Sequence, residues 1–151
     1  MIKKFNSQIR EVKSGKNCKV IEPVNLYECE FGNNVFIGPF VEITKGVIIG
    51  NNTRVSSHSF ICELVTIGSD CFIGHGVMFT NDLFKTGKLG GSKKNWFSTK
   101  IENNVLIGSN ATILPVKICE GSVIGAGSVV TKDIKTKGIY AGNPAKLLRK
   151  L

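Results

Sequence analysis

Apolar residues recur at every sixth position through most of this chain. Nine of them follow one another at that spacing: Phe31, Ile37, Ile43, Ile49, Val55, Ile61, Ile67, Ile73 and Phe79. The period resumes at Ile101, Ile107 and Ile113, then slips by one position and continues at Ile118, Ile124 and Val130. An amphipathic helix repeats its apolar face every three to four residues, so this period does not fit a helix. Short strands of β-branched residues separated by turns fit it well.

Two further columns keep the same period. The residue after the apolar anchor is often glycine: Gly32, Gly38, Gly50, Gly68, Gly74, Gly108 and Gly125. The fourth residue after the anchor is usually small or β-branched: Val35, Val41, Val47, Thr53, Ser59, Val65, Cys71, Val77, Val105, Ala111, Ser122 and Ser128. The pattern predicts an all-β solenoid over about residues 20–135, with each anchor pointing inward and each small residue at a corner.

The ends and one interruption depart from the period. Residues 1–19 show no clear repeat, and we expect them to cap the first coil. The chain is expected to leave the solenoid at 134–138 and to end in a short helix over 145–151, with Pro144 in its first turn. We therefore expect a single domain over 1–151, with a protruding loop at 81–100 and a C-terminal cap at 136–151.

The net charge of +9 is concentrated in two segments. Residues 81–100 carry five lysines and one acid, and residues 132–151 carry six basic residues and one acid. These excesses of +4 and +5 account for the whole net charge. They suit a compact polyanionic ligand at least as well as a nucleic acid, and we expect no nucleic-acid partner. The alternative is that the lysines only keep a loop and a tail soluble.

Cysteine usage and hydropathy indicate the compartment. The five cysteines form no CxxC pair and are odd in number, which favours small buried thiols over a disulfide framework or a zinc knuckle. No apolar run approaches the roughly 20 residues of a membrane span, and the first residues lack the apolar segment of a secretory signal. We expect a cytoplasmic protein without membrane insertion.

The repeat [Ile/Val]-Gly-x-x-[small]-x resembles that of the hexapeptide-repeat acyltransferases. The resemblance implies a left-handed parallel β-helix in which three hexads form one triangular coil. It also implies a homotrimer of subunits packed side by side. In that family, a loop at the place of 81–100 reaches a neighbouring subunit and helps to close the active site.

The C-terminal segments 125–134 and 141–146 resemble those of family members that use acetyl-coenzyme A. The resemblance implies that the pantetheine arm contacts backbone amides at small corner residues and that cations hold the phosphates. The residues expected to bind this co-substrate are Ser109, Ala111, Ala126, Lys132, Pro144, Lys146 and Arg149.

The segments 33–43, 57–63 and 73–82 resemble N-acetyltransferases that act on nucleotide-linked 3-amino sugars, of the dTDP-3-amino-3,6-dideoxyhexose type. Those enzymes supply acetamido sugars for surface polysaccharides such as O-antigen or S-layer glycans. Galactoside, maltose and xenobiotic acetyltransferases of the same fold carry a catalytic histidine where the chain leaves for its loop. This chain has Asn81 and Asp82 there, which favours an amine acceptor, since a neutral amine is a competent nucleophile without a strong base.

The expected reaction is direct attack of the sugar amine on the acetyl thioester. Asn81 would orient the amine or the thioester, and backbone amides would stabilise the tetrahedral oxyanion. Asp82 and Glu63 are the acidic alternatives for holding the amine, and Phe84 and Trp96 are expected to contact the substrate. Two structural alternatives remain open: Asn81 ends a strand as a turn residue, and Trp96 pins the loop to the solenoid wall.

The two histidines, His58 and His75, lie 17 residues apart, which places them near one corner of adjacent coils. We assign His75 a catalytic role and His58 a role in substrate binding. Structural hydrogen bonding and metal binding are the alternatives. A three-histidine zinc site needs one more histidine than the chain has, and no metal is expected.

Two rival functions stay open. One is an O-acetyltransferase acting on a sugar or a small hydroxyl compound, which would depend on His75 as a base. The other is a trimeric metal or scaffold protein without acyl transfer. The pattern does not distinguish dTDP from UDP, nor acetyl from a longer acyl group.

Overall fold

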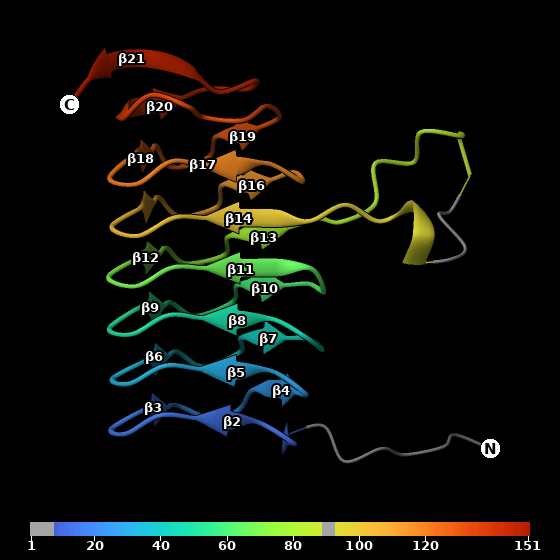
Figure 1. The fold of residues 1–151 in the computed structure, drawn as a ribbon, viewed down its shortest axis with the longest axis vertical. Coiled ribbons are helices and arrows are strands. Elements are labelled where there is room, and N and C mark those ends of the chain that lie inside the picture. Colours follow the sequence, from blue (N-terminus) through green and yellow to red (C-terminus); the bar gives the residue numbers. More distant parts are fainter. Residues whose placement is uncertain (1–7, 89–92) are drawn as a thin grey trace.

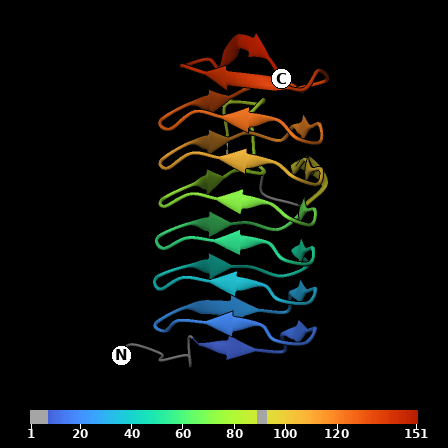
Figure 2. The same ribbon diagram turned by 90° about the vertical axis from the view of Figure 1, so that its left-hand side faces the viewer.

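The computed structural model describes residues 8–88 and 93–151 as a parallel β-helix of stacked triangular coils. Figures 1 and 2 show the coils rising from the N-terminal end to the C-terminal end, each contributing one short strand to each of three sheets. The only helical element among the described residues is one 3₁₀ turn, η1 (Lys93–Asn95). The predicted all-β solenoid is confirmed.

The strands are grouped by sheet. The seven-stranded sheet contains β1 (Ile9–Arg10), β4 (Asn25–Tyr27), β7 (Glu42–Ile43), β10 (Phe60–Ile61), β13 (Met78–Phe79), β16 (Thr112–Ile113) and β19 (Val129–Val130). The six-stranded sheet contains β2 (Lys13–Ser14), β5 (Glu30–Phe31), β8 (Ile48–Ile49), β11 (Val65–Ile67), β14 (Thr99–Ile101) and β17 (Lys117–Ile118). The eight-stranded sheet contains β3 (Lys19–Val20), β6 (Phe36–Ile37), β9 (Arg54–Val55), β12 (Phe72–Ile73), β15 (Leu106–Ile107), β18 (Val123–Ile124), β20 (Gly138–Ala141) and β21 (Lys146–Lys150).

The anchors of the six-residue period form the core. Equivalent residues pair across coils, for example Leu26 with Ile43 and Ile43 with Ile61, so they are 17 or 18 residues apart in sequence. Every anchor from Phe31 to Val130 is buried, and so is the small residue four positions later. Burying a branched aliphatic side chain contributes roughly 1.5–3 kcal/mol, so this column supplies most of the driving force for folding.

Three corners join the sheets, and we name them by their contents. The loop corner (28–29, 44–47, 62–64 and 80–98) joins the seven-stranded sheet to the six-stranded sheet. The asparagine corner (32–35, 50–53, 68–71 and 102–105) joins the six-stranded sheet to the eight-stranded sheet. The histidine corner (38–41, 56–59, 74–77, 108–111 and 125–128) leads back to the seven-stranded sheet.

Side-chain amides link successive coils at the asparagine corner. Asn34 Nδ2 donates to Asn52 Oδ1, and Asn52 Nδ2 donates to Asp70 Oδ1, both at 2.9 Å. All three residues have φ near +57° to +58°, a left-handed conformation that Asn and Asp tolerate better than most residues. The adjoining glycines are required for a different reason: a Cβ at Gly68 would lie 2.8 Å from the backbone nitrogen of Asn103 on the next coil.

The N-terminal segment differs from its expected role as an irregular cap. Strands β1, β2 and β3 form a regular first coil in which Ile9 pairs with Leu26 and Lys13 with Glu30. The sequence period hides this coil because Ser14 occupies the register of the apolar anchor Phe31. Residues 1–7 lie outside the described part of the chain.

The expected C-terminal helix is wrong. Residues 146–150 form strand β21, which pairs antiparallel with β20, and β20 continues the eight-stranded sheet by pairing with β18. A helix of about seven residues is marginal on its own, because nucleation is costly. Pairing with β20 instead satisfies the backbone groups of the last edge strand. The solenoid also runs further than expected, since β20 adds a parallel strand to the eight-stranded sheet beyond residue 135.

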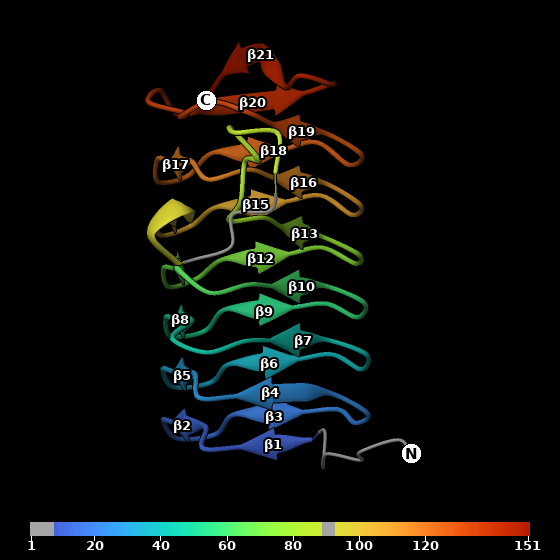
Figure 3. The same cartoon turned by 90° about the vertical axis from the view of Figure 1, so that its right-hand side faces the viewer.

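The loop leaves the solenoid after β13 and returns at β14, as Figures 1 and 3 show. Its base is structured: Asp82 and Trp96 form an antiparallel bridge, and the Phe97 amide donates to the Asn81 carbonyl at 2.8 Å. Residues 89–92 are outside the described ranges. The five cysteines are free thiols, of which Cys29, Cys62 and Cys71 are buried. Across the described chain, no helix has the length and hydropathy that crossing a bilayer requires.

Candidate functional site

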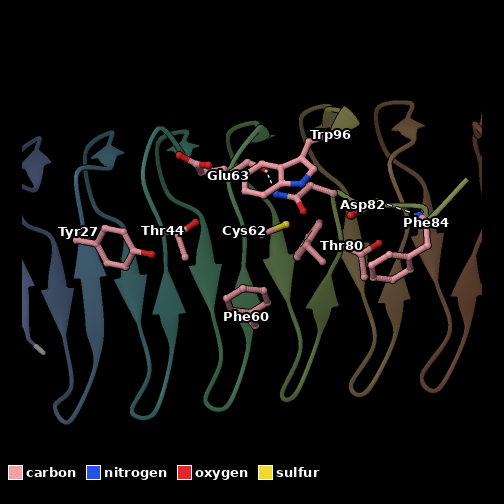
Figure 4. Close-up of a pocket in the computed structure, with 11 residues that line it drawn as sticks. Tyr27, Thr44, Phe60, Cys62, Glu63, Thr80, Asp82, Phe84 and Trp96 are labelled. Atoms are coloured by element: carbon pink, nitrogen blue, oxygen red, sulfur yellow. Dashed lines mark hydrogen bonds between the residues drawn. The ribbon is translucent and has the colours of Figure 1, made fainter. Parts of the chain in front are cut away.

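A large hollow lies on the seven-stranded sheet beside the loop corner, and we call it the main cavity. It has a volume of about 390 Å³. Its lining comes from four consecutive coils and from the loop: Tyr27, Thr44, Phe60, Cys62, Glu63, Phe79, Thr80, Asn81, Asp82, Phe84 and Trp96. Figure 4 shows these side chains converging from the sheet and from the loop.

One row of the lining follows the coil repeat. Tyr27, Thr44, Cys62 and Thr80 each come directly after an inward anchor of the seven-stranded sheet, and Figure 4 shows them in succession across the coils. This row and Phe60 are absent from the residues predicted from the sequence. The row could have been found by taking the residue after every third anchor, because at that position the chain leaves the seven-stranded sheet and enters the loop corner.

Aromatic side chains form the walls. Phe60 points outward from the sheet, and Phe84 and Trp96 come from the loop. Trp96 lies over the row between Cys62 and Thr80 in Figure 4, and it also lines a smaller neighbouring hollow with Lys45 and Glu63. Aromatic faces beside a few polar groups are typical of pockets that hold a sugar or a base. The expectation that Phe84 and Trp96 contact a ligand is thus compatible with their positions and stays a prediction.

The polar groups of the cavity gather where the chain enters the loop. Asn81 is half-buried, and its Nδ2 donates to the Glu63 carbonyl oxygen at 3.3 Å. Asp82 Oδ1 accepts from the Phe84 amide at 2.8 Å, which fixes the carboxylate at the loop entrance. The structure therefore brings together Glu63, Asn81, Asp82, Phe84 and Trp96, five of the residues predicted for catalysis and substrate binding.

Cys62 is the one thiol in the cavity lining. Burial raises its pKa to about 11, which outweighs the lowering effect of a backbone hydrogen bond. At neutral pH the thiol is therefore protonated, and a protonated thiol is a poor nucleophile. This environment argues against an acyl-cysteine intermediate at the site.

The two histidines lie at the histidine corner, at the other end of the strands that carry the main cavity. The Nδ1 atom of His75 is 2.8 Å from Ser57 Oγ, and His58 stacks on Phe40 with ring centroids 4.8 Å apart. Their expected proximity on adjacent coils is confirmed. Neither lines the main cavity of its own chain, so the structure does not join His75 to Asn81 within one subunit.

The residues expected to bind the co-substrate fall into four places. Ser109 and Ala126 follow His75 in one column of the histidine corner, and Pro144 belongs to the turn whose Gly142 amide donates to Ser128 Oγ. Lys146 and Arg149 lie on β21, and Lys132 follows β19 at the end of the seven-stranded sheet.

Ala111 does not fit the role expected of it. Its side chain is fully buried, its amide donates to the Gly108 carbonyl, and its carbonyl accepts from the Met78 amide. The residue predicted to present open backbone to a ligand is a corner residue of the core.

No cluster of three or more potential metal-ligating His, Cys, Asp or Glu side chains occurs within residues 8–88 and 93–151.

The candidate site consists of two edges of one prism. The loop corner holds a cavity with an amide, carboxylates and aromatic walls, and the histidine corner carries small residues leading toward the basic C-terminal strand.

Two family models match the chain. One, described as the bacterial transferase hexapeptide (six repeats), covers residues 28–63, and the other, the hexapeptide repeat of succinyl-transferase, covers residues 98–132. These matches confirm that the six-residue period is the hexapeptide repeat of bacterial transferases. The fold is accordingly the left-handed β-helix that the resemblance implied.

Individual relatives agree with the family models. The chain is 30% identical over 163 aligned positions to the bifunctional protein GlmU of Thermotoga petrophila. The alignment covers 89% of this chain and 36% of that protein. The chain thus spans between about a fifth and about a third of the length of the curated relatives it matches.

Among solved structures, the N-acyltransferase AntD from Bacillus cereus, in complex with dTDP and coenzyme A, superposes with a TM-score of 0.82. That match has 22% identity and covers 91% of this chain and 83% of AntD. A hexapeptide-repeat acetyltransferase from Vibrio cholerae, complexed with acetyl-coenzyme A, is 28% identical with a TM-score of 0.62. It covers 74% of this chain and 63% of that one.

Proposed function

Because this chain is a hexapeptide-repeat protein of the bacterial transferase type, we propose that it transfers the acetyl group of acetyl-coenzyme A to the amine of a nucleotide-linked amino sugar. The observation that carries this proposal is the position of Asn81, at the mouth of an aromatic cavity where the chain enters its loop. The acetyltransferase from Vibrio cholerae that binds acetyl-coenzyme A supports the choice of co-substrate.

An amide at this position suits an amine acceptor. A carboxylate stabilises the ammonium form of a nearby amine and raises its pKa, whereas the carbonyl of an amide orients the neutral amine with less stabilisation of the cation. The neutral amine attacks the thioester carbonyl, the C–N bond forms, the C–S bond breaks, and the amine proton passes to the departing thiolate or to water. Asn81 positions the nucleophile, and Asp82 and Glu63 are the acidic alternatives for holding the amine.

The cavity favours a sugar ring over a smaller amine. Its volume of about 390 Å³ and its walls of Phe60, Phe84 and Trp96 offer apolar faces for a deoxysugar. Thr44 and Thr80 lie along its floor and supply hydroxyl groups for polar substituents. These features support a 3-amino-3,6-dideoxyhexose as the acceptor sugar. We expect the acetylation to take place in the cytoplasm and the product to be used for surface polysaccharide.

We assign the co-substrate to the histidine corner. Ser109 and Ala126 leave that edge free of large side chains, so a thin pantetheine arm can lie along it toward His75. Lys146 and Arg149 on β21 lie at the end of this path and supply cations for its phosphates.

A homotrimer would bring the two edges together, with the loop corner of one subunit facing the histidine corner of the next. Exposed apolar side chains flank the histidine corner: Phe40 is 57% exposed, Met78 41% and Leu106 45%. Such a patch is typical of a protein–protein contact. We expect sedimentation equilibrium of the full chain to give three times the monomer mass, and a mass of one chain would contradict this assembly.

The function is tested by mixing the protein with acetyl-coenzyme A and a panel of dTDP- and UDP-linked amino sugars. We expect free thiol to be released with at least one amino sugar, together with a gain of one acetyl group in its mass. The matching 3-hydroxy sugars serve as controls and should release no thiol. Release with the hydroxy sugars alone would establish the O-acetyltransferase instead. If coenzyme A does not raise the melting temperature, the non-transferase alternative gains support.

A further inference from the structure

A second, smaller cavity lies within the loop, next to the main cavity. It has a volume of about 90 Å³ and is lined by Asp82, Lys85, Thr86, Lys88, Lys94, Asn95 and Phe97. Asp82 belongs to both cavities, so the two adjoin at the loop entrance. The second cavity is thus the neighbour of the main cavity on the side of the loop.

The shape of the loop brings its cations together. The Gly87 amide donates to the Phe84 carbonyl at 2.8 Å, which closes a tight turn. The Lys85 ammonium lies 4.2 Å from the centre of the Phe97 ring, an attractive cation–π geometry that holds this lysine at the cavity. The turn and η1 thus present lysines from both arms of the loop to one space.

The charge of this cavity suits a polyanion. Three lysines and one carboxylate, Asp82, line it, and Asp82 already accepts a hydrogen bond from the Phe84 amide. Lys88 and Lys94 form no ion pair with any residue in the described ranges. Lysines held near one another without partners repel, and an anion with two phosphates relieves that repulsion.

We propose that the loop lysines Lys85, Lys88 and Lys94 bind the diphosphate of the acceptor, while its amino sugar occupies the main cavity. The inference rests on the proposed function and adds to it the residues that bind the diphosphate. Lys146 and Arg149 of β21 then bind the phosphates of coenzyme A, so coenzyme A and the nucleotide sugar are held by separate groups of cations. Free amino sugars lack the anion and are poor acceptors for this reason.

The test compares two double variants with the same change of charge. Lys88→Gln with Lys94→Gln removes two cations from the loop, and Lys16→Gln with Lys19→Gln removes two exposed cations from the first coil. Trp96 is the only tryptophan and lines the adjoining cavity, so its fluorescence reports binding. UDP, dTDP and coenzyme A are titrated separately into each full-length variant.

We expect the loop variant to raise the Kd of UDP or dTDP by about tenfold, since two lysine–phosphate contacts are lost. The Kd of coenzyme A should not change, and the control variant should match the unmodified protein. In turnover, KM for the nucleotide sugar should rise and kcat should stay within about twofold. An unchanged nucleotide Kd overturns the proposal, and so does weakened binding of coenzyme A alone.

Failure of the function is distinguishable from failure of this inference. Nucleotide binding that depends on the loop lysines, without any acetyl transfer, supports the diphosphate site and contradicts the acetyltransferase. Acetyl transfer to nucleotide sugars with the same KM in both double variants supports the enzyme and contradicts the diphosphate site.

Discussion

Replacing Asn81 with alanine is expected to lower kcat/KM for acetyl transfer by about 10²- to 10³-fold. The amide carbonyl would no longer orient the sugar amine toward the thioester, and loss of one positioning hydrogen bond at a reacting centre typically costs this much. The loss should appear mainly in kcat, because the aromatic walls and the loop still bind the acceptor. Steady-state thiol release with the best nucleotide amino sugar measures it.

A control variant and a stability measurement test whether the loss is specific to Asn81. Thr66→Ala, on the exposed face of the six-stranded sheet, should leave kcat and KM unchanged. The Asn81→Ala protein should keep its melting temperature within a few degrees, because the substituted side chain makes one long hydrogen bond to Glu63. Full activity of Asn81→Ala would remove this residue from the mechanism. If His75→Ala abolishes turnover while Asn81→Ala does not, the O-acetyltransferase is favoured.

Substitution of Ile49 by alanine is expected to destabilise the solenoid by about 2–5 kcal/mol. Ile49 is 1% exposed and stacks between Phe31 and Ile67 of the adjoining coils, so its loss leaves a cavity that close-packed neighbours cannot fill. The adjacent Ile48 is the matched control: it has the same side chain on the same strand but is 47% exposed on the outer face.

Urea unfolding followed by circular dichroism measures both variants. Ile48→Ala should cost less than about 1 kcal/mol, since it removes a partly solvated side chain. Equal losses for the two variants would mean that the alternation of inward and outward positions along β8 does not control stability.

The repeat was predictable from the sequence because one physical requirement acts at every coil. Each anchor must be apolar and each corner residue small, so Ile73 or Val77 can be assigned without any knowledge of distant residues. The ends did not follow the same rule. Ser14 breaks the apolar column although its coil is regular, and the tail pairs with β20 through backbone groups that leave no side-chain signature.

The candidate site was predictable in part for a related reason. Asn81, Asp82 and Trp96 stand out because they interrupt the period, whereas Tyr27, Thr44 and Cys62 are hidden within it. His75 precedes the two-residue strand β13 and Asn81 follows it, so the two residues lie at opposite ends of that strand. That distinction needs the positions of the corners, which the period alone does not give.

The coil spacing of 17 or 18 residues limits how the protein can change in length. If a whole coil were removed, the strands on either side of it could pair directly, and every remaining side chain would stay on its original face. The prism would become about 4.8 Å shorter. Removing a single residue within a strand would instead turn the following anchors outward. Viable insertions and deletions within the strands should therefore come in complete coils, whereas the corners, where coils of 17 and 18 residues already differ by one, and the loop can vary one residue at a time.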